Sequence, residues 1–92
     1  LKDKVTKVKA KAKKGKIDVS WKKYKKASGY IVYRAESKYG VYDEFAVVKK
    51  NSFKDNYSVK GRKFYYKVRA FKNKGDGKIL SGISKKASVK AK

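Results

Sequence analysis

The stretch that decides the fold is Phe64-Tyr65-Tyr66-Lys67-Val68-Arg69-Ala70-Phe71. Its side chains alternate with a period of two, which places neighbouring residues on opposite faces of a β-sheet. One face is apolar and consists of Phe64, Tyr66, Val68 and Ala70. The other is aromatic and basic, unlike an ordinary solvated face, and consists of Tyr65, Lys67, Arg69 and Phe71. The pattern predicts a central strand with one face in the core.

Six further stretches have strand patterns and are separated by turn signals. In the clearest, Lys16–Lys22, the side chains of Ile17, Val19 and Trp21 share one face. The others are Val5–Ala12 with a break near Thr6, Tyr30–Ala35, Tyr42–Val48, Asn51–Tyr57, and Ile79–Val89 with a bulge or bend at Ser81-Gly82. The strongest turn signal is Asn73–Lys78, where Asp76-Gly77 suits positive φ in a hairpin. Seven short strands without helical periodicity predict an all-β sandwich.

The composition limits the size and the partners of the domain. A chain of 92 residues forms one domain, and its 40% apolar residues exceed what a disordered basic tail would carry. The 29 Lys and Arg against 7 Asp and Glu give a net charge of +22, which predicts salt-dependent adhesion to anionic polymers. Only three of the basic residues are Arg, at positions 34, 62 and 69, so we expect nucleic acid to bind nonspecifically.

The residues that are missing argue against catalysis. The chain contains no Cys and no His, which removes disulfides, thiol chemistry, the usual zinc ligands and the commonest general base. We therefore expect no enzyme activity, no cofactor and no metal. Leu1 is not an initiator, so we expect residues 1–92 to be a piece of a larger protein. No apolar run approaches the ~18 residues of a membrane helix, and no membrane insertion is expected.

Four motifs together resemble the fibronectin type III module, most closely the versions in bacterial secreted and surface proteins. They are Ile17-x-Val19-x-Trp21, Gly29-Tyr30-x-Val32-Tyr33-Arg34, Ser52-Phe53-x-Asp55, and Gly61 followed by Phe64-x-Tyr66-Lys67-Val68-Arg69-Ala70. The resemblance implies a seven-stranded immunoglobulin-like sandwich of two antiparallel sheets. It also implies a core made of Ile17, Val19, Trp21, Tyr30, Val32, Phe64, Tyr66, Val68 and Ala70.

One feature of the family is absent. Such sandwiches usually carry a Tyr near the start of the sixth strand whose hydroxyl bonds back to the chain upstream. Phe64 occupies that position and has no hydroxyl. Either Tyr65 replaces the bond through a register shift, or packing alone holds the corner, which is the interpretation we favour.

The main candidate binding site is the outer face of the sheet that contains the third and sixth strands. Aromatic and basic side chains could stack there on sugars or bases and bind phosphates or sulfates. The simpler alternative is cross-strand pairing that only stabilises the sheet. The candidate residues are Tyr33, Tyr65, Lys67, Arg69 and Phe71.

Three short motifs are weaker candidates. Lys74-Gly75-Asp76 resembles the integrin-binding Arg-Gly-Asp of some animal fibronectin modules, although chance and turn chemistry explain it better. Asn56-Tyr57-Ser58 matches the N-glycosylation pattern, which is incidental in a bacterial protein. Asp43-Glu44 is the only adjacent acidic pair and is interpreted as local neutralisation of lysines.

The leading hypothesis is a noncatalytic spacer or attachment module of a larger exported bacterial protein, extracellular or at the cell surface. Its expected partners are neighbouring domains and anionic wall polymers or glycans, and we expect a monomer. Two alternatives stay open: a carbohydrate- or polyanion-binding module that uses the aromatic and basic face, and a nucleic-acid-binding basic domain. Fold resemblance does not choose between them, because one fold hosts many functions.

Overall fold

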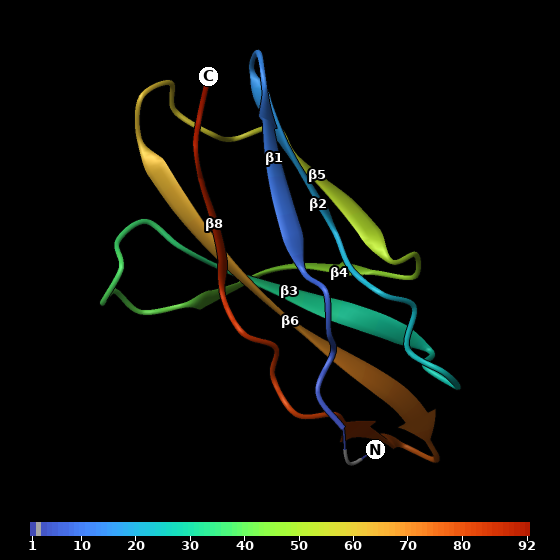
Figure 1. Cartoon of the computed structure of the whole chain (residues 1–92). Coiled ribbons are helices and arrows are strands. Elements are labelled where there is room, and N and C mark those ends of the chain that lie inside the picture. Colours follow the sequence, from blue (N-terminus) through green and yellow to red (C-terminus); the bar gives the residue numbers. More distant parts are fainter. Residues whose placement is uncertain (2) are drawn as a thin grey trace.

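The computed structural model describes residue 1 and residues 3–92, which form two antiparallel sheets (Figure 1). The smaller sheet has the order β1-β2-β5, with β1 at Lys9–Lys13, β2 at Lys16–Ser20 and β5 at Ser52–Asp55. The larger sheet has the order β4-β3-β6-β7, and β8 also pairs with β6. Its strands are β3 (Gly29–Ala35), β4 (Asp43–Val48), β6 (Lys63–Lys74), β7 (Gly77–Leu80) and β8 (Ala87–Lys90). The prediction of an all-β sandwich of two antiparallel sheets is confirmed.

Strand β6 is central to the larger sheet, as its alternating pattern predicted. It pairs with β3 from Phe71 opposite Gly29 to Tyr65 opposite Ala35, and it also pairs with β7 and β8. The strand is longer than the predicted stretch, because it begins at Lys63 and continues to Lys74.

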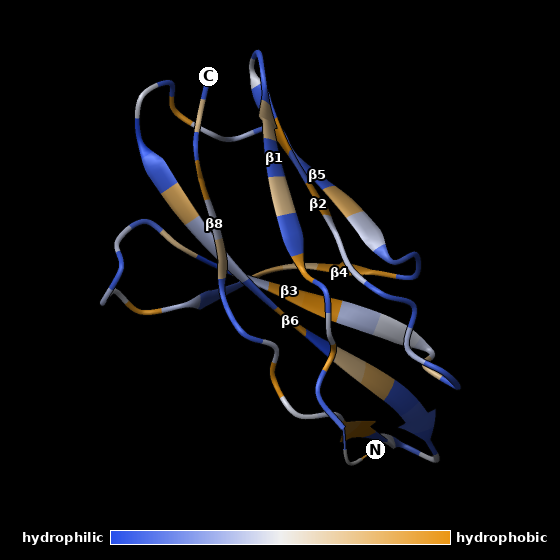
Figure 2. Ribbon diagram, viewed as in Figure 1, coloured by the Kyte–Doolittle hydropathy of each residue, from blue (hydrophilic) through white to orange (hydrophobic). Residues whose placement is uncertain are grey.

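The core lies between the two sheets and follows the alternation along the strands. Figure 2 shows hydrophobic and hydrophilic residues in turn along β1 and β6. Trp21 is only 4% exposed and meets the Tyr30 ring edge-on, with 5.2 Å between centroids. Buried together in this cluster are Ile17, Val19, Trp21, Tyr30, Val32, Phe64, Tyr66, Val68 and Ala70.

The prediction of a single last strand, Ile79–Val89, was wrong, because the segment is divided into β7 and β8. Between them, two serine hydroxyls replace backbone pairing with β6. The Val68 amide donates to Ser84 Oγ at 2.8 Å, and the Ser84 amide donates to the Val68 carbonyl at 2.9 Å. Ser81 forms the same pair of bonds with Ala70. The two sheets therefore have eight strands in all in place of the expected seven, three in the smaller sheet and five in the larger, yet β6 keeps its hydrogen bonds.

The first strand and the last hairpin also differ from prediction in detail. The break predicted near Thr6 is present at Lys7, which adopts a left-handed backbone with φ of 58°, so β1 begins at Lys9 and not at Val5. Val5 is nevertheless buried. In the β6–β7 hairpin the positive φ falls on Gly75 and not on Gly77, so Gly75-Asp76 form the two-residue turn.

The corner before β6 is held without a tyrosine hydroxyl. Phe64 is fully buried, and no hydrogen bond of the Tyr65 hydroxyl is found among the residues that the structure describes. Backbone bonds tie the corner to the C-terminal segment instead: the Gly61 amide donates to the Ala91 carbonyl at 2.9 Å, and the Ala91 amide donates to Arg62 at 2.8 Å. Packing and these bonds replace the usual side-chain bond.

The molecule is elongated, with principal extents of 42 × 24 × 22 Å. The N-terminus and the C-terminus lie at opposite ends of it (Figure 1). The β1–β2 turn and the β5–β6 loop lie at the C-terminal end, and the β6–β7 hairpin lies at the N-terminal end. Within residues 1 and 3–92, no helix is long and apolar enough to cross a membrane.

Candidate functional site

The candidate residues on the outer face of the larger sheet lie next to one another. The register places Tyr33 opposite Lys67, Ile31 opposite Arg69, and Gly29 opposite Phe71. Because Tyr30 and Val32 are in the core, the alternation of β3 turns Ile31 and Tyr33 to the outside. We call Tyr33, Tyr65, Lys67, Arg69 and Phe71 the outer sheet face.

Two of the three aromatic rings on the outer sheet face are covered by the protein itself. Tyr65 and Phe71 are each only 7% exposed. Lys78 Nζ lies 4.5 Å from the Phe71 ring centroid, and Lys63 Nζ lies 5.7 Å from that of Tyr65. These contacts are cation–π pairs within the protein, so the two rings stabilise the sheet and offer little surface for stacking on a ligand.

The close packing of Phe71 also explains one glycine in the motif. A Cβ atom at position 29 would lie 2.7 Å from Phe71 Cζ and 2.9 Å from the Val48 carbonyl oxygen. Only glycine lets the ring pack against the backbone of β3 at this point.

Tyr42 extends the outer sheet face, and sequence reasoning did not assign it there. Lys67 Nζ lies 4.4 Å from the centroid of its ring. Its hydroxyl is buried without a hydrogen-bond partner among the described residues, and burial raises the pKa of Tyr42. Tyr42 was predicted to be the first residue of the strand Tyr42–Val48, but β4 begins at Asp43, and alternation along one strand does not indicate a contact with Lys67 of β6.

Arg69 is the one arginine of the outer sheet face, and it forms no ion pair among the described residues. It is half-buried, and its Nε atom is buried with no partner among the described residues. The three ion pairs found in the described part of the chain are Lys13–Asp18, Arg34–Asp55 and Arg62–Glu36, so none involves Arg69. A guanidinium without a carboxylate is able to bind an anion.

The three short motifs are all at the surface, and one of them borders the outer sheet face, because Glu44 lies opposite Tyr33 in the β3–β4 register. Lys74-Gly75-Asp76 forms the β6–β7 hairpin, and the φ of 58° at Gly75 accounts for its glycine. Asn56 is exposed just after β5, and Asp43-Glu44 begins β4. Among the described residues, no group of three or more Asp, Glu, His or Cys is placed to hold a metal ion.

A buried polar network lies at one edge of the core. Asp55 is 0% exposed and accepts hydrogen bonds from Arg34 Nη1 at 2.8 Å, from the Tyr66 hydroxyl at 2.5 Å and from the Tyr57 amide at 2.8 Å. Burial and the bond to Asp55 raise the pKa of Tyr66. Because all three protein donors converge on one carboxylate, the network has no room for a ligand and holds the two sheets together.

Sequence reasoning did not identify this network, although a signal was present. Arg34 continues the inward alternation of Tyr30 and Val32, and Asp55 pairs across from the core residue Ile17. A charged residue in a core position needs a buried partner of opposite charge.

The two sheets, their order and the core between them define an immunoglobulin-like β-sandwich of the fibronectin type III kind. The chain is a fibronectin type III module in its fold. A solved Fn3-like protein from Clostridium thermocellum superimposes with a TM-score of 0.76 and 20% identity, over 97% of this chain and 90% of that protein. No family model matches the chain.

The chain is also similar to segments of much longer proteins. It is 36% identical over 78 residues to an amylopullulanase from Thermoanaerobacter thermohydrosulfuricus, which is 84% of this chain but 5% of that protein. A β-1,2-glucanase structure from Parabacteroides distasonis matches with a TM-score of 0.78 and 26% identity, over 95% of this chain and 13% of that one. The chain thus corresponds to one module of larger proteins.

Proposed function

We propose that the chain is a noncatalytic spacer and attachment module of a larger exported bacterial protein, located outside the cell or on its surface. Its basic surface holds the module against anionic wall polymers or acidic glycans, and the module is a monomer. Catalysis, where the parent protein has it, resides in another domain.

The similarity to longer proteins supports the modular part of the proposal. The match covers most of this chain and only 5% of the amylopullulanase. A unit of this kind is a self-contained sandwich that can be placed between or beside other domains.

The main support for the attachment role is the large number of positively charged side chains that have no ion pair among the described residues. Against 29 Lys and Arg, the described part of the chain contains three ion pairs, so most ammonium groups face water without a carboxylate. A surface of this kind releases counterions when it binds a polyanion, which gives affinity that falls steeply with salt.

The unpaired Arg69 favours a second candidate, a site for an anionic glycan on the outer sheet face. Arg69, Lys67 and Tyr33 would provide most of the contacts, because the Tyr65 and Phe71 rings are covered. Such a site would bind acidic groups through charge and not neutral sugars through stacking.

Binding to purified Gram-positive cell wall across a salt series tests the proposal. We expect retention at low salt that is lost by a few hundred millimolar NaCl, with DNA competing weakly for the same surface. Pullulan serves as the neutral control polymer, chosen because the relatives are amylopullulanases. Retention that ignores salt would contradict the electrostatic account, and salt-resistant binding of pullulan would favour a sugar-stacking site.

A further inference from the structure

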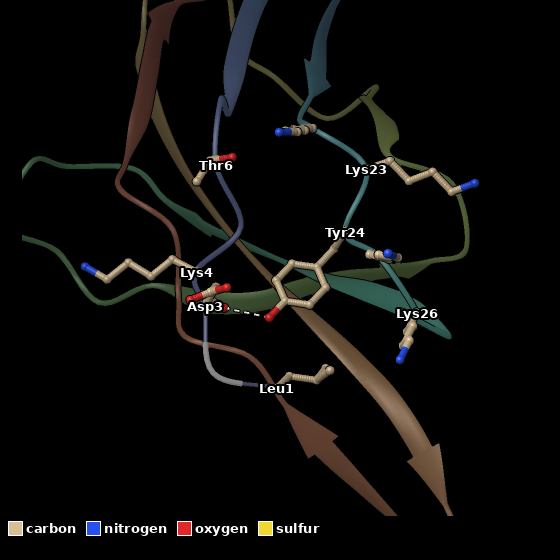
Figure 3. Close-up of a pocket in the computed structure, with 9 residues that line it drawn as sticks. Leu1, Asp3, Lys4, Thr6, Lys23, Tyr24 and Lys26 are labelled. Atoms are coloured by element: carbon tan, nitrogen blue, oxygen red, sulfur yellow. Dashed lines mark hydrogen bonds between the residues drawn. The ribbon is translucent and has the colours of Figure 1, made fainter.

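The loop between β2 and β3, residues 21–28, lies between two hollows that are lined with lysines. The first has a volume of about 830 Å³, and its lysines are Lys4, Lys22, Lys23, Lys25 and Lys26 (Figure 3). The second has a volume of about 500 Å³, and its lysines are Lys23, Lys26, Lys49 and Lys50. Because Lys23, Tyr24 and Lys26 line both hollows, they form a ridge between them. We call the seven lysines Lys4, Lys22, Lys23, Lys25, Lys26, Lys49 and Lys50 the lysine track.

The lysine track carries almost no compensating negative charge. Asp3 is the one carboxylate among the residues that line the two hollows. None of the seven lysines belongs to the three ion pairs found within residues 1 and 3–92. Seven like charges around two open hollows give a positive local potential that attracts anions.

The walls of the first hollow are fixed by hydrogen bonds. The Lys22 amide donates to the Thr6 carbonyl at 3.0 Å. The Tyr24 hydroxyl donates to the Asp3 carbonyl at 3.0 Å (Figure 3). On the other side, the Trp21 amide donates to the Asn51 carbonyl at 3.2 Å. Since the loop is tied to both neighbouring segments, a ligand would not have to order it, which favours binding.

One lysine of the track occupies a position that suits glycine. Lys26 has a φ of 67°, in a turn closed by the bond from the Ala27 amide to the Tyr24 carbonyl at 3.2 Å. A left-handed residue in such a turn is usually Gly or Asn, and a lysine costs about 1 kcal/mol in comparison.

The side chains of the track diverge. In Figure 3 the ammonium groups of Lys4, Lys23 and Lys26 point in different directions around the Tyr24 ring. This arrangement does not enclose a single small ion. It fits several anionic groups spaced along one molecule that crosses the ridge from the first hollow to the second.

We propose that the lysine track binds a flexible linear polymer with a phosphodiester in each repeat, of the poly(glycerol phosphate) type. Lysine binds phosphate as a point charge and needs no fixed orientation of the polymer. The track has no arginine to read base edges, so sequence-specific recognition of nucleic acid fits less well. The proposal rests on the attachment function above and assigns it to one part of the surface.

Two charge-matched variants of the full chain test the assignment. The track variant carries Lys22→Gln, Lys23→Gln, Lys25→Gln and Lys26→Gln. The control variant carries Lys9→Gln, Lys11→Gln, Lys54→Gln and Lys90→Gln, at exposed strand positions without ion pairs. The probe is poly(glycerol phosphate) of defined length, titrated by calorimetry at several salt concentrations.

We expect the track variant to lose at least tenfold in affinity and the control variant less than threefold. The slope of log K against log[salt] should fall by about 3–4 in the track variant only, since each phosphate contact contributes about one. A second variant, Lys49→Gln with Lys50→Gln, should show an intermediate loss of affinity. It tests the contribution of the second hollow without a change in the loop of residues 21–28.

Three outcomes would overturn the assignment. Equal losses of affinity in the track and control variants would mean that binding depends on net charge alone. This result would refute the assignment to the lysine track and would leave the attachment function intact. Tighter binding of single-stranded DNA than of the polymer, through the same lysines, would replace the ligand class. Absence of binding by the unmodified chain at low salt would refute both the assignment to the lysine track and the proposed attachment function.

Discussion

The replacement Asp55→Ala should cause the largest loss of stability of any single change on the core edge. It removes the acceptor of Arg34 and of the Tyr66 hydroxyl, and leaves a guanidinium that is only 14% exposed without its counter-ion. Removing one partner of a buried ion pair costs about 3–5 kcal/mol. A domain of this size has a free energy of unfolding of about 5–14 kcal/mol, so the variant should be close to the limit of folding.

Urea unfolding monitored by the fluorescence of Trp21, the only tryptophan, measures the effect. With a slope of about 1.5 kcal/mol per molar urea, a loss of about 4 kcal/mol lowers the midpoint by about 2.7 M. The double variant Arg34→Met with Asp55→Leu is the matched control, because it removes both charges and should recover much of the loss. A single variant that loses less than 1 kcal/mol, or a double variant no better than the single, would refute the reasoning.

Three further changes test other parts of the structure. Above pH 10 the free energy of unfolding should fall by about 1.4 kcal/mol per pH unit. The raised pKa of Tyr66 keeps the hydroxyl protonated in the folded state, whereas the unfolded chain, in which the pKa has its ordinary value of 10.0, releases the proton. Urea midpoints from pH 9 to 11 measure this slope, and Tyr66→Phe should flatten it. Ser84→Ala leaves the Val68 amide without its acceptor and should cost about 1–3 kcal/mol in thermal or urea unfolding, whereas the exposed Ser88→Ala should cost almost nothing. Lys26→Gly relieves the left-handed backbone and should raise stability by about 0.5–1 kcal/mol; a loss would show that the turn is not strained.

The fold was predictable because the pattern that specifies it is local. Alternation in the stretch from Phe64 to Phe71 is enough to place the central strand, and Ile17, Val19 and Trp21 place the facing sheet. Strand ends were less predictable. A break near Thr6 and a bulge or bend at Ser81-Gly82 were predicted, but the exact strand ends were not. The break at Lys7 depends on one backbone angle, and the division between β7 and β8 depends on the bonds of Ser81 and Ser84 to β6.

The candidate site was predictable in its position but not in its exposure. The register of β3 with β6 brings Tyr33, Lys67 and Arg69 together, as alternation indicates. Whether an aromatic ring is covered depends on lysines from other strands, such as Lys78 over Phe71, and alternation along one strand says nothing about these. Strand periodicity also does not identify a site in residues 21–28, because a loop has no such periodicity. The run Lys22-Lys23-Tyr24-Lys25-Lys26 was nevertheless visible in the sequence.

The position of the two chain ends has a mechanical consequence. Since they lie at opposite ends of a molecule 42 Å long, a pull applied between them runs along the strands and not across them. The ladders of β1 with β2 and of β8 with β6 would then be loaded in shear, so several hydrogen bonds must break at once before the sandwich opens. A module with this geometry resists stretching better than one whose terminal strands can be peeled away one bond at a time.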